Sequence, residues 1–260
     1  MNTDDTVNDL DEKLITALGD LAAAAPGTLM DRLFAQWARV PGQLGEVFVA
    51  FSERGVQFLR TVDHVHGDAE RFAQLYRDRF ARPLRPATTL PTELRPALSG
   101  RPSRALRLDL TGLSVFERAV LAATQTIPAG QTRPYSWVAS EAGSPQTVRA
   151  VGSVLARNPL PLLVPCHRVV RADGHIGDYI FGTAGKEQLL RGEDANLDEV
   201  EELTRRGVRY LASDTTGVVC YPTCRDARRI TERHRRGFRT LAQAINAGYR
   251  PCQRCRPGTA

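Results

Sequence analysis

The chain lacks the features of a membrane-inserted or secreted protein. No stretch approaches the ~18 consecutive apolar residues that a membrane-spanning helix needs. The opening MNTDDTVNDLDEK is acidic, whereas a signal peptide is basic and then apolar. With 42% hydrophobic and 25% charged residues, the composition also lacks the bias of disordered or fibrous proteins. We therefore expect a soluble, cytoplasmic protein whose 260 residues are long enough for two domains.

The five cysteines do not form a disulfide pattern. Their number is odd, and no signal peptide accompanies them, which fits a reducing compartment. Four of them form two tight pairs, Cys220-x3-Cys224 and Cys252-x2-Cys255, which favour a tetrahedral metal site. The fifth, Cys166, stands alone and is a candidate nucleophile, although a buried structural cysteine gives the same pattern.

Lysine and acidic residues are scarce near the C-terminus. Residues 205–260 contain 13 arginines, no lysine and three acidic residues, a net charge of +10 that leaves −4 for the first 204 residues. Such a segment is typical of proteins that bind a polyanion, most often nucleic acid. A solvated basic tail has the same composition, so charge alone leaves both interpretations open.

Local patterns predict a helical N-terminal extension and a small α/β subdomain. Apolar residues recur near helical spacing up to residue 42, which predicts a helix. From Val47 to Val62 apolar and polar residues alternate about a turn at 52–55, which predicts a hairpin, and a helix is predicted over 68–81. Prolines between 83 and 102 predict an extended connector. The apolar residues of the first helix are Leu29, Leu33, Phe34, Trp37 and Val40.

The middle of the chain predicts a mostly helical unit. After a short strand over 106–110, Ser114 and Glu117 form a capping box that begins a helix to about 126. Two shorter helices follow, over 136–142 and up to about 156, the second with Ser144 as N-cap and Pro145 as first residue. This string fits a DNA-binding helix-turn-helix or any helical hairpin. A buried strand is predicted over 162–164 and onward through Cys166, where neighbouring side chains would point to opposite faces.

Three short motifs follow one another along this part of the chain. They are Asn158-Pro159, Pro165-Cys166-His167-Arg168-Val169 and Lys186-Glu187-Gln188-Leu189-Leu190. Their order and spacing resemble the O6-alkylguanine-DNA alkyltransferases, from about residue 47 to residue 194 and most specifically over 116–193. The resemblance implies a ribonuclease-H-like α/β subdomain followed by a helical helix-turn-helix catalytic domain. It also implies irreversible transfer of an alkyl group from damaged guanine in DNA to the protein's own cysteine.

The same resemblance implies roles for five residues of the reaction site. A thiolate attacks a methyl carbon well, but a free cysteine with a pKa near ~8.5 is mostly protonated at neutral pH. By resemblance, His167 acts on Cys166 through a water and Glu193 orients His167, in parallel with a hydrolase triad. Tyr135 donates a proton toward the leaving guanine, and Asn158 braces the site.

Further residues are implied in contacts with DNA. The target base must be flipped out of the duplex, and Arg149 stands at the arginine-finger position while Leu155 stands at an apolar intercalating position. Tyr179 is implied in DNA binding. It begins the stretch Tyr179-Ile180-Phe181-Gly182, which is bulkier than the small residues of many family members. We therefore expect a narrower pocket that favours methyl over bulky alkyl groups.

The C-terminal cysteines lie in a second resemblance. DTTGVVCYPTC and AGYRPCQRC resemble the zinc domain of Ada proteins over about residues 197–257. The resemblance implies zinc bound by Cys220, Cys224, Cys252 and Cys255, with Cys220 accepting a methyl group from a DNA methylphosphotriester. A structural zinc module that only binds DNA remains the alternative. The module is C-terminal here, whereas in Ada proteins it usually precedes the other domains. A methyl-sensing transcription activator of the usual kind is therefore not expected.

The sequence thus predicts an α/β protein with a small zinc domain. A helical extension (1–42) precedes a ribonuclease-H-like subdomain and linker (43–105), a catalytic, DNA-binding domain (106–196) and a C-terminal four-cysteine zinc module (197–260). The expected function is that of a single-turnover alkyltransferase, monomeric and acting on double-stranded DNA with alkylated guanine or methylated phosphate. A non-enzymatic DNA-binding damage sensor, in which the zinc module only supplies affinity, is the competing hypothesis.

Overall fold

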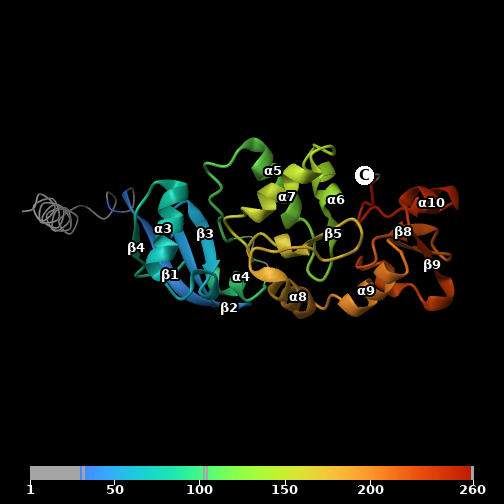
Figure 1. Ribbon diagram of the computed structural model, residues 1–260, viewed down its shortest axis with the longest axis horizontal. Helices are drawn as coiled ribbons and strands as arrows, with labels where there is room; N and C mark the ends of the chain where they lie inside the picture. Colours follow the sequence, from blue (N-terminus) through green and yellow to red (C-terminus); the bar gives the residue numbers. More distant parts are fainter. Residues whose placement is uncertain (1–29, 31–32, 102, 104, 259–260) are drawn as a thin grey trace, which may run out of the picture.

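The computed structural model describes residue 30 and residues 33–101, 103 and 105–258. Three structural units follow one another along its long axis: an N-terminal sheet, a central helical unit and a small C-terminal sheet (Figure 1). No helix within these described ranges is long and apolar enough to cross a membrane.

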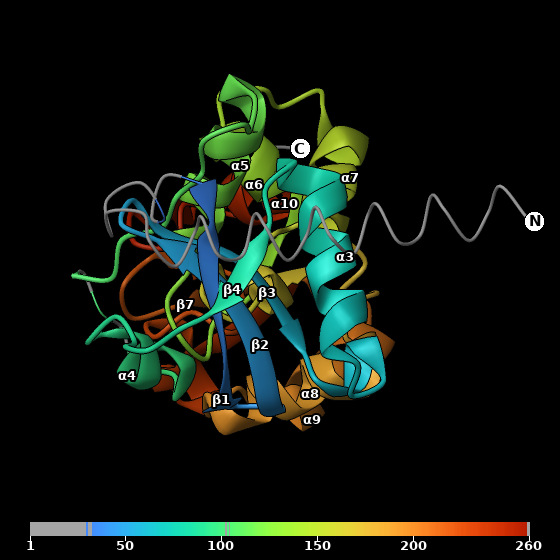
Figure 2. The same ribbon diagram turned by 90° about the vertical axis from the view of Figure 1, so that its left-hand side faces the viewer.

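The N-terminal unit is a mixed sheet with strand order β3-β2-β1-β4. β1, β2 and β3 form an antiparallel meander, and β4 runs parallel to β1. Helix α3 covers one face and helix α4 the other (Figure 2). The elements are β1 Ala35–Gly42, β2 Gly45–Ser52, β3 Gly55–Thr61, the 3-10 turn Asp63–Val65, α3 Ala69–Phe80, β4 Leu84–Pro86 and α4 Leu94–Leu98.

Two expectations for this unit are confirmed. The turn at 52–55 joins β2 and β3 as an antiparallel hairpin. Helix α3 begins after Asp68, whose carboxylate accepts hydrogen bonds from the backbone N–H groups of Glu70 (2.8 Å) and Arg71 (3.2 Å). This cap satisfies two donors that the first helical turn leaves unpaired.

The predicted N-terminal helix is wrong over 35–42, which form strand β1; residues 1–29, including Leu29, lie outside the described residues. Trp37 packs with Phe48 and Phe72 on one face of the sheet, while Val40 joins the core on the other face. In a helix, residues three apart share one face, whereas in a strand they point to opposite faces. The spacing of these apolar residues therefore fitted a helix as well as a strand. Hydrogen-bonded pairing with β2 makes the segment a strand.

The proline-rich connector is more regular than expected. It contains the edge strand β4 and the short helix α4. Pro86 is tolerated at the end of β4 because an edge strand does not need every backbone N–H for pairing. α4 buries Leu94 and Leu98 against the sheet.

The central unit packs three helices around a shared core. Helix α5 (Val115–Gln125) begins with the predicted capping box of Ser114 and Glu117. A turn joins α6 (Tyr135–Glu141) to α7 (Val148–Ala156). A short parallel pair, β5 (Arg133–Pro134) and β6 (Val169–Val170), holds the loop before α6 beside the segment that follows the lone cysteine. Helix α8 (Gly182–Gly192) closes this unit.

Three local predictions in this unit are wrong. Helix α7 begins at Val148 rather than at Ser144 and Pro145, because Thr147 folds back and donates its N–H (3.0 Å) and its hydroxyl (2.7 Å) to the carbonyl oxygen of Ser144. The strand expected over 106–110 is reduced to one bridge, Val56 to Leu108. The strand expected over 162–164 and onward through Cys166 is a turn at 162–163 followed by a 3-10 turn over Cys166–Arg168, so side-chain alternation does not apply there.

The C-terminal unit is a second four-stranded sheet, with order β10-β8-β7-β9. Helix α9 leads into it from the central unit, and α10 packs on it over a small core. Its elements are α9 Leu197–Arg205, β7 Tyr210–Ser213, β8 Val218–Cys220, the 3-10 turns Ala227–Arg229 and Glu232–His234, β9 Arg235–Phe238, α10 Leu241–Asn246 and β10 Arg250–Pro251.

Candidate active site and metal centre

Cys166 lies in the 3-10 turn before β6 and is only 5% exposed. The side chain of Asn158, fully buried, donates a hydrogen bond from Nδ2 to Cys166 Sγ at 3.1 Å and contacts the carbonyl oxygen of Val164 at 3.2 Å. Its Oδ1 accepts the backbone N–H of Leu160 at 3.0 Å, so both ends of the amide are fixed. Asn158 thereby holds the thiol in one position.

His167 follows Cys166 in the same turn and contacts Glu193 at the end of α8. His167 Nε2 lies 3.0 Å from Glu193 Oε1, and Arg168 also donates to this carboxylate from Nε and Nη2. Burial alone would raise the pKa of Glu193, but hydrogen bonds from His167 and Arg168 and their charge hold this pKa at about 2. Glu193 is therefore a carboxylate at neutral pH and accepts the Nε2 proton.

The other ring nitrogen of His167 is available as a base. Nδ1 is buried and has no hydrogen-bond partner among the described residues. Since Nε2 carries the proton given to Glu193, Nδ1 presents a lone pair. Burial lowers the pKa of His167 from its usual 6.5, although Glu193 opposes this shift, so the imidazole is neutral at pH 7.

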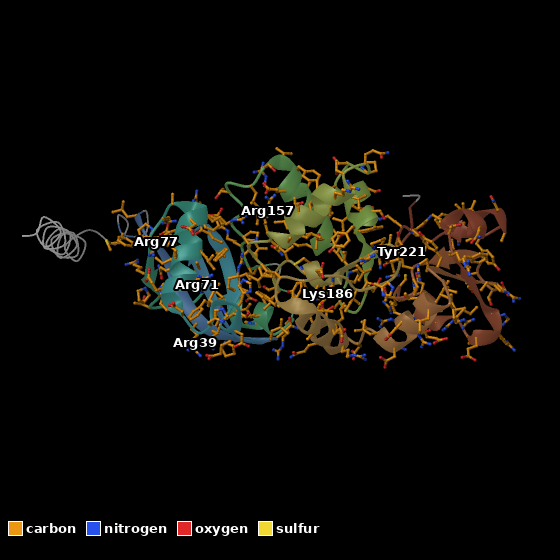
Figure 3. All side chains as sticks on the ribbon, viewed as in Figure 1. Arg39, Arg71, Arg77, Arg157, Lys186 and Tyr221 are labelled. Carbon is orange, nitrogen blue, oxygen red and sulfur yellow. The ribbon has the colours of Figure 1, made fainter. Side chains whose placement is uncertain are left out.

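Two buried cations, Lys186 and Arg60, contribute positive charge to the surroundings of the thiol. Lys186 on α8, at the centre of Figure 3, is fully buried and donates from Nζ to the carbonyl oxygen of Val169 at 2.7 Å. Arg60 on β3 reaches the carbonyl oxygen of Asn158 at 3.4 Å. Burial raises the pKa of the Cys166 thiol, while the Asn158 hydrogen bond and the charges of Lys186 and Arg60 oppose the rise. The site thus compensates in part for removing a thiolate from water.

These cations were missed as site residues by the sequence analysis. Lys186 stood in a quoted motif without a role, and its place in that motif was a usable signal. Arg60 carries no local signal, because its burial depends on the N-terminal sheet packing against the central unit.

Two tyrosines flank the site. Tyr135, the first residue of α6, is half-buried, and burial followed by the negative charge of Cys166 and Asp178 raises its pKa. Tyr179 packs edge-on against His167, with ring centroids 6.1 Å apart, and burial raises its pKa well above the usual value. Both therefore remain protonated phenols at neutral pH.

The structure separates the two residues predicted on α7 for DNA contact. Arg149 is exposed near the start of the helix. Leu155, by contrast, is 5% exposed and belongs to the core. The prediction of Leu155 as an intercalating residue does not fit this burial, because a side chain that enters DNA must be accessible.

The four C-terminal cysteines converge. The Sγ atoms of Cys220, Cys224, Cys252 and Cys255 all lie within 4.8 Å of one another and are buried. Pairing of β10 with β8 brings the two cysteine pairs together, since the N–H of Cys252 donates to the carbonyl oxygen of Val219 at 2.9 Å. Four thiols at such distances fit one tetrahedral ion, for which sulfur is a preferred ligand.

The loop over 128–134 connects the C-terminal unit, which carries the four cysteines, to the Cys166 site. On one side, Arg228 donates to the carbonyl oxygen of Gly130, and Thr223 Oγ1 accepts the N–H of Thr132 at 2.8 Å. On the other side, the N–H of Gly130 donates to Glu193 Oε2 at 3.0 Å. Sequence reasoning missed this connection, which depends on how the units pack.

Comparisons with known proteins separate the chain into the same two functional parts. Residues 115–195 match the family model "6-O-methylguanine DNA methyltransferase, DNA binding domain", and residues 203–258 match "Metal binding domain of Ada". Cys166, His167 and Glu193 fall within the first match, and all four C-terminal cysteines fall within the second.

Individual curated proteins are similar to the same parts of the chain. The bifunctional transcriptional activator/DNA repair enzyme Ada of Escherichia coli is 36% identical over 64% of this chain and 47% of its own length. A methylated-DNA–protein-cysteine methyltransferase of Methanothermobacter thermautotrophicus is 43% identical over 35% of this chain and 51% of its own. The chain spans about half the length of these curated relatives.

A solved structure shares its fold with a larger part of the chain than the first family match covers. A variant of the Mycobacterium tuberculosis O6-methylguanine methyltransferase is 27% identical, with a TM-score of 0.50 over 62% of this chain and 93% of its own. The chain therefore combines a 6-O-methylguanine DNA methyltransferase DNA-binding domain with a C-terminal metal-binding domain of the Ada type.

Proposed function

We propose that this protein repairs DNA by moving a methyl group irreversibly from O6 of guanine to its own Cys166. The observation that carries the proposal is a buried thiol held by Asn158 beside a His167–Glu193 pair, within the domain that matches the methyltransferase family. The partner is double-stranded DNA, bound by the monomer. The mixed order β3-β2-β1-β4 supports a ribonuclease-H-like N-terminal subdomain.

The reaction is a displacement at the methyl carbon. His167 Nδ1 takes the thiol proton through a water, and the Cys166 thiolate forms a bond from sulfur to the methyl carbon. The bond from carbon to guanine O6 breaks, and its electrons stay on the base. The phenol of Tyr135 donates the proton that neutralises the departing guanine. Since nothing removes the methyl group from the thioether, each molecule reacts once.

The target base must leave the duplex to reach a thiol as buried as Cys166. Flipping costs a few kcal/mol of lost stacking, and an inserted side chain holds the gap open. We assign the inserted side chain to Arg149, which is exposed on α7 beside the turn that joins α6. We assign Tyr179 to the wall of the pocket that receives the flipped base. The bulky residues after Tyr179 favour methyl over larger alkyl groups.

We further propose that the C-terminal domain holds zinc and that Cys220 is a second methyl acceptor. Four cysteine ligands suit zinc, which when bound keeps them as thiolates at neutral pH. Cys220 lines a groove of about 670 Å³ whose wall also carries Arg229, Arg233 and Arg250. These cations suit a DNA backbone, and Cys220 sulfur would form a bond to the methyl carbon of a phosphotriester while the phosphate regains its negative charge.

The proposal is tested with two labelled substrates. The protein is incubated with DNA that carries labelled O6-methylguanine and, separately, with DNA that carries labelled methylphosphotriesters, and the labelled peptides are mapped. We expect one label on Cys166 from the first DNA and one on Cys220 from the second. Label on neither cysteine would favour the non-enzymatic sensor, and label on Cys166 alone would make the zinc domain a structural module.

The exchange Glu193→Gln should slow methyl transfer to Cys166 by roughly 10²-fold, the usual scale of general-base assistance. A neutral amide cannot stabilise the protonated imidazole, so the pKa of His167 falls further below 6.5. Single-turnover rates against pH should show a lower plateau and an acid limb at lower pH than in the wild type. An unmoved limb would mean that His167 is not the base.

Two precautions keep this test clear. The pKa of Glu193 is lowered from its ordinary 4.5 to about 2, so the ionised carboxylate stabilises the folded protein above pH 4.5. This stabilisation is lost as the pH falls from 4.5 toward about 2, and rates are therefore compared above pH 5. Glu187→Gln, an exposed change on the same helix, should leave rate and profile unchanged.

The exchange Arg149→Ala should weaken binding of O6-methylguanine in duplex DNA by roughly tenfold, because the side chain that fills the gap left by the flipped-out base is lost. The loss should be smaller when the lesion lies in single-stranded DNA, where no gap must be filled. Arg157→Ala, at the exposed far end of α7, serves as the control for a simple phosphate contact. Equal losses on both substrates for Arg149→Ala would refute the insertion of Arg149 into the duplex.

A further inference from the structure

Arg133 is a buried cation at the boundary between the methyltransferase domain and the metal-binding domain. It lies on β5 and is 2% exposed. Its guanidinium donates to the carbonyl oxygen of Thr132 and to Gln131 Oε1, both at 2.7 Å and both neutral. Among the described residues no carboxylate forms an ion pair with it, and its Nε has no hydrogen-bond partner.

The surroundings of this guanidinium come from both domains. Trp137 of α6 lies 5.7 Å from it and Tyr221, which follows the metal-site Cys220, lies 5.5 Å from it. Figure 3 shows Tyr221 where the central unit meets the C-terminal unit. Burial lowers the pKa of Arg133, and the negative charges of Cys255 and Cys224 oppose this shift.

Electrostatics identifies what balances this charge. A buried cation without an anion costs several kcal/mol, and aromatic faces recover only part of that. Four thiolates around a divalent ion carry a net charge of −2. With metal bound, the four-cysteine centre, whose Cys220 precedes the contacting Tyr221, would supply such an anion.

We propose that Arg133 is the counter-cation of the four-cysteine metal centre, supplied by the methyltransferase domain across the domain boundary. It is a positioning residue, which stabilises the thiolates without binding the metal. The proposal does not depend on whether Cys220 accepts a methyl group. It makes metal affinity a property of the full chain rather than of the C-terminal domain alone.

The reverse effect follows from thermodynamic linkage. If Arg133 strengthens metal binding, then bound metal stabilises the domain that carries Arg133 by the same free energy. Metal loss removes the anion that balances the guanidinium. The stabilisation that metal gives to the methyltransferase domain should therefore depend on Arg133.

The test compares zinc affinity of full-length variants by competition with a chromogenic chelator. Arg133→Met removes the charge and should weaken zinc binding by about 10- to 100-fold, the usual effect of losing a partner of the ligands. Arg133→Lys keeps the charge and should retain most of the affinity. Arg256→Met is the matched control, because Arg256 also lies 5.7 Å from Trp137 but is exposed and pairs with Glu141.

Thermal unfolding with and without zinc provides the second readout. Zinc should raise the unfolding temperature of the methyltransferase domain less in Arg133→Met than in the wild type or in Arg256→Met. If Arg133→Met does not fold, Arg133→Gln is compared with Arg133→Lys, and the charged variant should bind zinc more tightly. Equal zinc affinity in charged and neutral variants, or unchanged affinity in Arg133→Met, would overturn the proposal.

Discussion

Cys166→Ala should accept no methyl group from O6-methylguanine while it still binds DNA that carries this lesion. The exchange removes the only atom that forms the new bond, whereas the exposed face of α7 and Tyr179, the proposed contact of the flipped base, are unchanged. The loss should therefore be complete rather than partial. It is measured as labelled methyl transferred per protein, with binding measured on the same oligonucleotide.

The substrate should contain O6-methylguanine as its only lesion, so that Cys220 has no phosphotriester to act on. Cys166→Ser is a useful companion, because its hydroxyl keeps the shape and hydrogen-bonding capacity of the site but is a far weaker nucleophile. Cys224→Ser, which changes a cysteine of the metal site instead, should still transfer methyl to Cys166. Stoichiometric transfer by Cys166→Ala would sink the assignment of the acceptor.

The sequence could predict the parts of the site that lie in short motifs. Asn158, Cys166 and His167 fall within ten consecutive residues, and one turn suffices to bring them together. Glu193 lies farther along the chain, and only the motifs on α8 indicated that it returns to His167. The capping box at Ser114 and the hairpin at 52–55 were also predictable, because both depend on local backbone chemistry.

The remaining features depend on packing that no local pattern records. β1 was predicted as a helix, since the spacing of Trp37 and Val40 fits one helical face as well as two faces of a strand. Leu155 was placed against DNA, but the core of the central unit takes it up. Arg133 has an ordinary sequence context, and its isolation from solvent follows only from the docking of the cysteine domain.

Removal of the metal should unfold the C-terminal domain and leave the rest of the chain folded. Other buried residues of this domain, such as Leu211 and Tyr221, pack in the core that it shares with the central unit. The core that belongs to this domain alone has, among the described residues, four buried residues, Ala212, Val219, Leu241 and Ala244. Such a small core cannot offset the conformational entropy of the ordered residues. Bound structural zinc contributes on the order of 10–16 kcal/mol in small domains, so most of the folding free energy here should come from the metal.

The expected observations are one zinc per chain and two unfolding transitions, of which chelation abolishes one. Trp137 gives a local signal in a Trp37→Phe variant, since Trp137 is 5% exposed and lies at the domain boundary. Its emission should shift to the red on chelation, because unfolding of the C-terminal domain admits water to the boundary.

Single cysteine variants separate the metal from other causes. Cys224→Ser should reproduce the effect of chelation, because three thiolates and a hydroxyl hold zinc poorly, while Cys166→Ser should keep both zinc and the second transition. The central unit should survive, since α5, α6 and α7 share a core with the N-terminal sheet. A metal-free protein in which the C-terminal transition is unchanged would mean that this domain folds on packing alone, and the four cysteines would then need another explanation.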